Sequence, residues 1–177
     1  KFFKKDPELL HIVRCKKCGL VFNKKQPTQA SLDRFYKHSS AMKTWTCGKE
    51  EKKEIDRQRE KFSPALDFFK SFVGIDNVLD IGCGNGWFLK WFKEQSPQSE
   101  CLGVEQNKDS ILECRAKAVE AVPYIPLSAK TYELITLWGT LEHLKDPKSM
   151  INKCSGLLSD RGFLLVCVPN ISCDEVK

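Results

Sequence analysis

Two kinds of hydrophobic pattern alternate along the second half of the chain. Short apolar runs typical of strands occupy 78–82, 101–105, 133–138 and 162–168, and segments with an apolar face at helical spacing occupy 86–95, 108–118 and 147–158. The stretch between 118 and 133 is poorly marked. Strands that alternate with helices are typical of an α/β fold with a doubly wound parallel sheet, which is the fold class that we expect here.

The front of the chain follows another pattern. Two short β-prone runs lie within residues 1–26, on either side of the sequence Cys-Lys-Lys-Cys-Gly, and helices are expected over 28–38 and about 49–72. We therefore predict a small β/helical segment and linker over 1–48 and an α/β domain over 49–177.

Composition narrows the classes of protein that fit. The chain has 177 residues, of which 41% are hydrophobic, enough for a real core. It contains no apolar run long enough for a membrane span and no signal-peptide core at its start. Nine cysteines scattered through predicted strands and helices favour a reducing, cytoplasmic setting over a disulfide scaffold. Because the first residue is not Met, and the last strand pattern ends close to the C-terminus, we expect a longer protein.

Positive charge is concentrated at the front. Residues 1–63 carry 17 basic and 8 acidic side chains, whereas 64–177 carry 12 and 15. Such asymmetry can indicate a nucleic-acid surface, but the run "GKEEKKEIDRQREK" mixes both signs at helical spacing. A solvated helix is the favoured interpretation.

The stretch "VLDIGCGNGWFLK", residues 78–90, places three glycines at a strand-to-helix junction. In open α/β folds this junction lies at the carboxyl edge of the sheet, where nucleotide-like ligands bind against main chain. A dinucleotide fingerprint needs a third glycine where Trp87 stands, and a P-loop needs Gly-Lys-Ser/Thr, which is absent. A ligand without phosphate is therefore favoured, with glycine needed where a side chain would collide with it.

The pattern Asp80-x-Gly82-x-Gly84-x-Gly86 resembles the first motif of the class I S-adenosylmethionine-dependent methyltransferases, which have a Rossmann-like fold. The resemblance implies that Asp80 holds the amino end of S-adenosylmethionine, directly or through water. It also implies that the main chain of the turn lies against the methionine and ribose. The candidate cofactor-binding residues of this turn are Asp80, Gly82, Cys83, Gly84, Asn85 and Gly86.

Three further stretches extend the resemblance to residues 78–170. In "CLGVEQN", Glu105 ends the next strand, where a carboxylate can accept both ribose hydroxyls, and Gln106 would lie near the adenine. "YELITLWGTLEHLKDP", which contributes Trp138 to the candidate cofactor site, and "LLSDRGFLLVCVPN" are similar to the fourth- and fifth-strand regions of small-molecule methyltransferases. We expect the strands that normally follow the fifth to lie outside this chain. The acid that commonly closes over adenine is not visible in "VPYIPLSAK", so either Ser128 or Ala129 completes the adenine pocket or residues are absent from this chain.

The resemblance implies methyl transfer by in-line displacement to a small-molecule acceptor, such as a sugar or a lipid-linked intermediate. His143 is the candidate general base, because histidine exchanges protons near neutral pH and this one follows a strand end. The alternative is a histidine bonded to local backbone at a helix start. Gly139 stands where some relatives carry an acid that helps to bind metal, so a metal at Glu142 and His143 is not expected.

Cys15 and Cys18 have the spacing of half a zinc site. The segment "RCKKCGLVF" with "FYKHSSAMKTW" is similar to N-terminal zinc-binding modules attached to some small-molecule methyltransferases. Cys47, His11 and His38 are possible completions, but a second cysteine pair before Lys1 suits the geometry better. A structural zinc is therefore expected in the intact protein.

Two rival functions stay open. A nucleic-acid methyltransferase would explain the basic front, although the aromatic-proline tetrad of DNA amino-methylating enzymes is replaced by "LWGTLE", and we expect no nucleic-acid partner. A non-catalytic zinc-knuckle module fused to a degenerate methyltransferase domain would explain the short stretch before Tyr132.

Overall fold

The computed structural model describes residues 11–38, 56, 60–65, 67, 74–126 and 130–170. The chain divides into two compact units, Lys1–Phe35 and Tyr36–Lys177. The boundary predicted near residue 48 stays a prediction.

The first unit contains an antiparallel hairpin of β1 (Ile12–Arg14) and β2 (Val21–Asn23), with Val13 opposite Phe22. Its turn closes through a hydrogen bond from the Gly19 N–H to the Cys15 carbonyl, 2.9 Å, and Gly19 has a φ of +76°. This is the β element predicted around the Cys-Lys-Lys-Cys-Gly turn. Helix α1 (Gln29–His38) follows, with the Thr28 hydroxyl accepting from the Ser31 N–H at its start.

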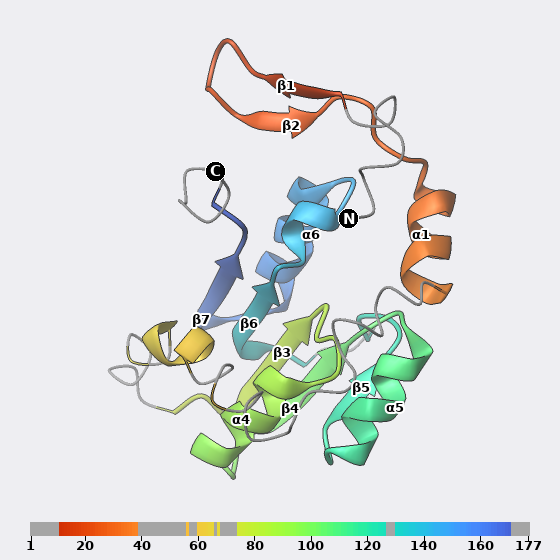
Figure 1. Cartoon of the computed structure of the whole chain (residues 1–177). Helices are drawn as coiled ribbons and strands as arrows, with labels where there is room; N and C mark the ends of the chain where they lie inside the picture. The colour runs from red at the N-terminus through yellow and green to blue at the C-terminus, as the bar shows by residue number, and fades with distance from the viewer. Residues whose placement is uncertain are drawn as a thin grey trace. The chain divides into compact units, whose positions relative to one another are not determined.

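The second unit contains a five-stranded, fully parallel sheet (Figure 1). The strand order is β5-β4-β3-β6-β7, so the chain starts in the middle, moves to one edge and then crosses to the other. The strands are β3 (Asn77–Ile81), β4 (Glu100–Val104), β5 (Glu120–Val122), β6 (Tyr132–Trp138) and β7 (Leu158–Cys167). The doubly wound α/β fold predicted from the alternating pattern is confirmed.

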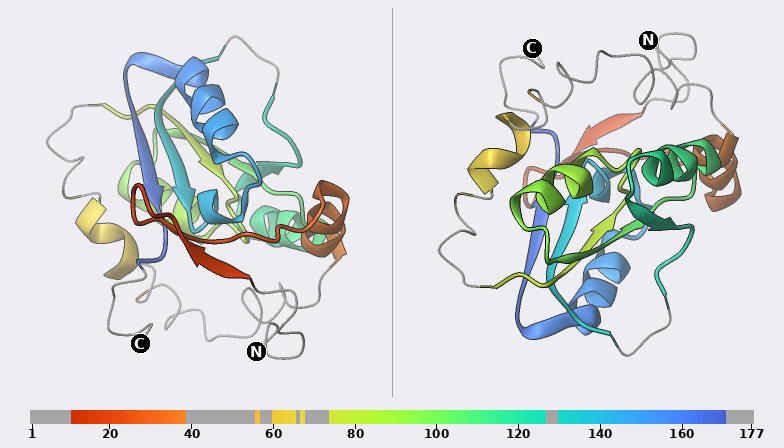
Figure 2. Two further views of the ribbon diagram at one scale, coloured as in Figure 1. Left: turned by 90° about the horizontal axis from the view of Figure 1, so that it is seen from above. Right: turned by 90° about the horizontal axis from the view of Figure 1, so that it is seen from below.

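Helices cover both faces of this sheet (Figure 2). On one face, Phe88 and Leu89 of α4 (Trp87–Gln95) and Cys114 of α5 (Lys108–Ala116) pack in a cluster with Val78 of β3. On the other face, Cys154 of α6 (Pro147–Leu157) packs in a second cluster with strand side chains. The sheet is therefore buried between two apolar layers, as its near-continuous apolar strands require.

The element bounds agree with the sequence pattern within a few residues, except in two regions. Strand β5 lies in the stretch that the pattern left unmarked; it has three residues, and Ala121 is its one buried side chain. Of the helix expected over about 49–72, the described residues 56, 60–65 and 67 are helical. Ser128 and Ala129, expected to complete the adenine pocket, lie outside the described residues.

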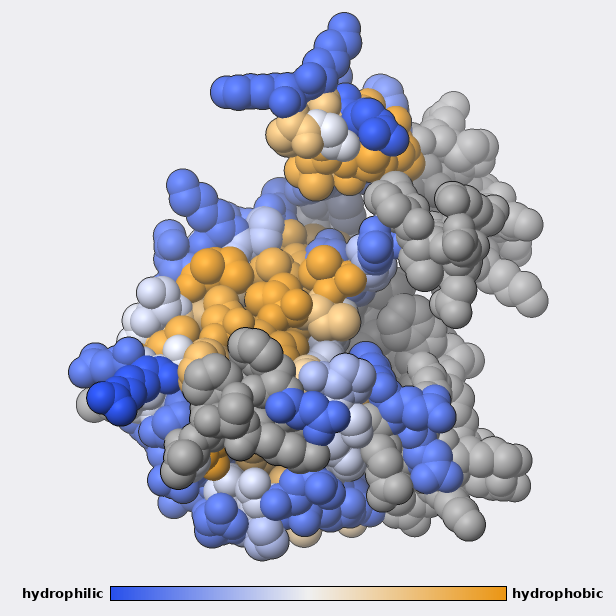
Figure 3. Space-filling model, turned by 90° about the vertical axis from the view of Figure 1, so that its left-hand side faces the viewer, coloured by the Kyte–Doolittle hydropathy of each residue, from blue (hydrophilic) through white to orange (hydrophobic). Residues whose placement is uncertain are grey.

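Strand β7 forms an edge of the sheet and pairs with β6. Val166 in this strand is 37% exposed and Val168, just beyond it, 47%. Figure 3 looks at the side of the unit on which β7 lies and shows apolar side chains gathered there. Among the described helices, none combines the length and apolar character that crossing a membrane requires.

Candidate cofactor site

The glycine turn lies at the carboxyl edge of the sheet, between β3 and α4. The N–H groups of Gly82 and Cys83 both donate to the Val104 carbonyl, at 2.8 and 3.1 Å, and the Gly86 N–H donates to the Cys83 carbonyl at 3.0 Å. These bonds tie the turn to the end of β4. The turn and the residues after β4 therefore form one site.

The three glycines of the turn have different reasons to be glycine. A Cβ on Gly82 would clash with the Thr140 side chain, its methyl group lying 2.7 Å away, and one on Gly86 would lie 3.0 Å from the Cys114 Sγ. A Cβ on Gly84, whose φ is +55°, would meet nothing within 4 Å. At Gly82 and Gly86 the protein itself fills the space that a side chain would need, whereas the space beside Gly84 is open; that a ligand requires glycine in this turn stays a prediction.

Asp80 lies near the end of the central strand and is 2% exposed. Its Oδ1 accepts a hydrogen bond from the Thr136 hydroxyl, 2.8 Å, because β3 and β6 pair in a register that sets the two residues side by side. Burial raises the pKa of the Asp80 carboxyl to about 7, against the opposing effects of the Thr136 hydroxyl and the Lys61 charge. The carboxyl is therefore close to changing charge at neutral pH.

Glu105 follows the end of the neighbouring strand β4 and is 8% exposed. Its Oε2 accepts from the Gly84 N–H at 3.1 Å and its Oε1 from the Asn107 N–H at 2.8 Å. Burial raises the pKa of this carboxyl, and the backbone N–H groups oppose the shift. A carboxylate can accept about four hydrogen bonds, so these two leave capacity for ligand hydroxyls. Gln106, next to it, is exposed.

The methyltransferase-domain family matches residues 47–177, most of the chain. The chain belongs to this family. A ubiquinone biosynthesis O-methyltransferase of Aliivibrio fischeri is 27% identical over 104 residues, 52% of this chain and 44% of that relative. The chain thus spans less than half the length of that relative.

Two solved structures share the fold of this methyltransferase domain. The plantazolicin methyltransferase in complex with SAH has a TM-score of 0.52 at 17% identity, covering 78% of this chain and 60% of that one. An amino pentose methyltransferase from Micromonospora echinaspora, bound to SAM, has a TM-score of 0.56 at 17% identity, covering 71% and 58%. The predicted class I methyltransferase-like fold is confirmed, and the assignment to the methyltransferases is confirmed at the level of the family.

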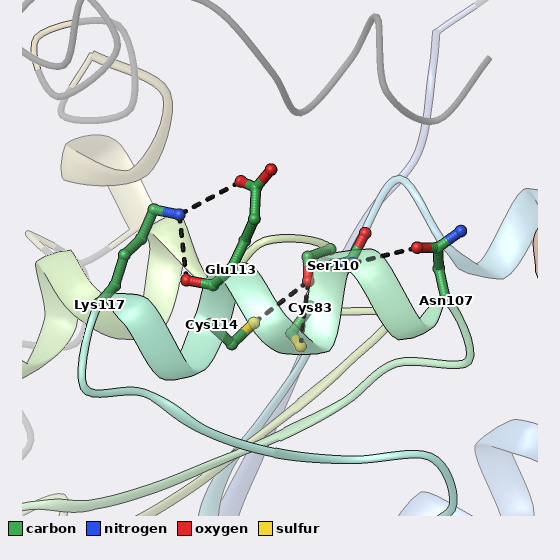
Figure 4. Close-up of polar contacts among 7 residues, drawn as sticks. Cys83, Asn107, Ser110, Glu113, Cys114 and Lys117 are labelled. Atoms are coloured by element: carbon green, nitrogen blue, oxygen red, sulfur yellow. Dashed lines mark hydrogen bonds and ion pairs between the residues drawn. The ribbon is translucent and has the colours of Figure 1, made fainter. Parts of the chain in front are cut away.

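Two buried thiols of the methyltransferase domain contact the Gly84 carbonyl (Figure 4). The Cys114 Sγ on α5 donates to it at 3.3 Å, and the Cys83 Sγ at 3.7 Å. The neighbouring Cys114 thiol, followed by burial, raises the pKa of Cys83. The Cys83 sulfur fits here because residue 103 in β4 is glycine: a Cβ on Gly103 would lie only 2.5 Å from that sulfur. Both thiols are therefore part of the turn's structure.

Trp138 ends β6 and joins an aromatic cluster. Its ring centroid lies 4.6 Å from Phe62 and 5.3 Å from Phe88, and the Lys61 Nζ lies 5.7 Å from it. The buried Trp138 Nε1 has no hydrogen-bond partner within the described part of the chain. This candidate residue therefore packs against Phe62 and Phe88, with a polar atom that has no partner among the described residues.

His143 lies in a short 3-10 helix, Leu141–His143, after β6. Its side chain is 43% exposed, its Nε2 lies 3.9 Å from the Glu142 Oε1, and its N–H donates to the Thr140 carbonyl at 3.0 Å. The same loop supplies Thr140 against Gly82. The structure thus brings the loop of His143 to the turn, and the imidazole itself is at the surface.

Cys15 and Cys18 lie in the hairpin of the first unit. Hydrogen bonds from the Cys18 and Lys17 backbone lower the pKa of the Cys15 thiol. Over the described ranges, no group of three or more His, Cys, Asp or Glu side chains could hold a metal ion. Two thiols are half of the tetrahedral set that structural zinc requires, so the described residues alone do not fit zinc. Cys47 lies outside them.

Sequence reasoning missed Thr136 and Cys114, which donate to Asp80 and Gly84, and Thr140, whose side chain faces Gly82. Thr136 had a signal, because it is a polar residue inside the apolar run "LITLW". No sequence pattern pointed to Cys114 or Thr140, since neither residue interrupts the hydrophobic pattern around it.

Proposed function

We propose that the protein transfers the methyl group of S-adenosylmethionine to a small-molecule acceptor. The observation that carries the proposal is the pair of buried carboxylates, Asp80 and Glu105, at the ends of neighbouring strands, with Glu105 bonded to the N–H of Gly84, the turn glycine beside open space. A ligand with an ammonium group at one end and ribose hydroxyls at the other suits two carboxylates so placed.

The residues of the chain would act mainly by holding the reactants. Glu105 would accept hydrogen bonds from the ribose hydroxyls. Asp80 is 2% exposed, so we assign it to the ammonium group through water or through the turn. The remaining turn residues, with Gln106 near the adenine and Trp138 beside the turn, complete the proposed binding set. S-Adenosylmethionine would supply a methyl group on a positive sulfur, which a nucleophile displaces in line.

His143 is the proposed general base. Its exposed imidazole stands on the loop that contacts the glycine turn, where an acceptor entering from solvent can reach it. The acceptor class rests on the small molecules named for the similar proteins, ubiquinone, plantazolicin and an amino pentose. A sugar or lipid-linked acceptor is the finer proposal.

Calorimetric titration with S-adenosylhomocysteine tests the site. Glu105→Ala should weaken binding about ten- to a hundredfold, because it removes a charge-assisted acceptor. Glu100→Ala is the matched control, since Glu100 begins the same strand and pairs with Lys130 at the surface. Equal affinity of Glu105→Ala and the parent would contradict the ribose assignment.

His143→Ala separates chemistry from binding in the same assay. Its affinity for S-adenosylhomocysteine should stay near that of the parent. With an acceptor in hand, turnover should fall about 10²- to 10⁴-fold if the imidazole removes a proton. Unchanged turnover would show that His143 is a surface residue and not the general base.

Two further parts of the proposal concern the whole protein. We infer a structural zinc held by Cys15 and Cys18 together with two ligands from residues that the structure does not describe. A cytoplasmic setting, inferred from the scattered cysteines, stays a prediction.

A further inference from the structure

The peptide groups of Gly84 are held from two sides. The Gly84 N–H donates to the Glu105 carboxylate at 3.1 Å. The Gly84 carbonyl accepts from the thiols of Cys114 and Cys83, at 3.3 and 3.7 Å, and Figure 4 shows these two thiols pointing toward the same oxygen. Gly84 is also the turn glycine beside open space. The glycine that a ligand can approach thus has both its N–H and its carbonyl held by side chains.

The two thiols differ in what they anchor. Cys83 belongs to the turn, so its thiol moves with Gly84. Cys114 belongs to α5, is 0% exposed, and makes the shorter of the two bonds. The Cys114 thiol therefore ties the turn to a different element, in a place from which water is excluded.

Helix α5 also holds the other half of the site. Its N-cap residue is Asn107, whose side chain accepts from the Ser110 N–H at 3.0 Å, and whose own N–H donates to the Glu105 Oε1 at 2.8 Å. The start of α5 thus positions Glu105, and its second turn positions Gly84. One rigid helix sets the spacing between the carboxylate and the open side of the turn.

We propose that Cys114 is a positioning residue of the cofactor site: its thiol, through the Gly84 carbonyl, holds the turn in the conformation that the adenosyl cofactor binds. The proposal rests on the proposed function. It requires that the hydrogen-bond donor at position 114, and not the bulk of the side chain, sets the affinity.

The test compares Cys114→Ala with Cys114→Ser, because both are smaller than cysteine and only serine keeps a donor. Cys154→Ala is the matched control, since Cys154 is also 0% exposed in a helix but packs on the opposite face of the sheet. Affinity for S-adenosylhomocysteine is measured by calorimetry and fold integrity by thermal unfolding.

We expect Cys114→Ala to weaken binding about three- to tenfold, the effect of one lost hydrogen bond, and Cys114→Ser to stay within about twofold of the parent. Cys154→Ala should lower the melting temperature and leave the affinity unchanged. If Cys114→Ala does not fold, Cys114→Val and Cys114→Thr, which match each other in shape, take its place: the valine variant should bind about three- to tenfold more weakly than the threonine variant, which keeps a donor.

Three results would overturn the inference: parental affinity in Cys114→Ala, equal losses in the alanine and serine variants, or an equal loss in Cys154→Ala. For the valine and threonine pair, equal affinities would do the same, because the donor at position 114 would then have no effect. A parent chain that binds no S-adenosylhomocysteine would instead refute the proposed function on which the inference rests.

Discussion

The hydrogen bond between Thr136 and Asp80 gives a sharp prediction for Thr136→Val. Valine has nearly the shape of threonine but no hydroxyl, so the change leaves the 0% exposed position filled and removes the 2.8 Å bond to the buried carboxyl. A hydrogen bond to an ionised group contributes about 1.5–3 kcal/mol. The loss should be of this size whenever Asp80 is ionised in the folded protein.

The ionisation of Asp80 makes this loss depend on pH. Folding raises the pKa of Asp80 from 3.8 to about 7, so the folded chain binds its proton more tightly than the unfolded chain does. Proton binding by Asp80 therefore stabilises the folded state by about 4 kcal/mol below about pH 4, and this stabilisation is lost as the pH rises through 7. In Thr136→Val the pKa rises further, because the hydroxyl that favours the ionised form is gone.

Urea unfolding at pH 5.5 and pH 8.5 measures both effects. We expect the free energy of unfolding of Thr136→Val to lie about 0.5–1 kcal/mol below the parent at pH 5.5 and about 1.5–3 kcal/mol below it at pH 8.5. Contributions from other titrating groups, Glu105 among them, cancel in the difference. Thr136→Ser, which keeps the hydroxyl, should show no pH dependence of its loss. An equal loss for Thr136→Val at both pH values would refute the assignment of a titrating Asp80.

The remaining predictions concern the glycine turn and the hairpin. Gly82→Ala should lower the free energy of unfolding by more than about 3 kcal/mol, because the positive φ and the clash with Thr140 both destabilise the folded state. Gly84→Ala should lower it by about 1–2 kcal/mol, because of its positive φ alone, and should weaken S-adenosylhomocysteine binding. Equal losses of the two variants in urea unfolding would refute this. Iodoacetamide at pH 7 should modify Cys15, whose thiol pKa is lowered, before Cys101, whose pKa burial raises to about 11, as mass spectrometry of timed samples can show. A form of the protein with residues before Lys1 should hold about one zinc by elemental analysis and lose it in Cys15→Ser; a metal-free form with an intact fold would contradict the zinc proposal.

Asp80 and Glu105 could be predicted from the sequence because each closes an apolar run, and the carboxyl ends of parallel strands meet at one edge of a sheet. Thr136 could not be assigned to Asp80, because their contact depends on the register of two strands 56 residues apart. Strand β5 was missed because three residues with one buried side chain give almost no alternation. The side chains that face Gly82 and Gly86 could not be predicted either, because they come from Thr140 and Cys114, which are distant along the chain.

Gly103 and Cys83 occupy one shared volume between β4 and the turn. A glycine inside a strand ordinarily weakens it, and here that cost is offset by the thiol that the missing side chain admits. The two positions should therefore evolve as a pair: in related sequences an alanine or larger residue at 103 should accompany a glycine at 83. A larger residue at 103 alone would clash with the Cys83 thiol, and a glycine at 83 alone would leave a void at the edge of the site.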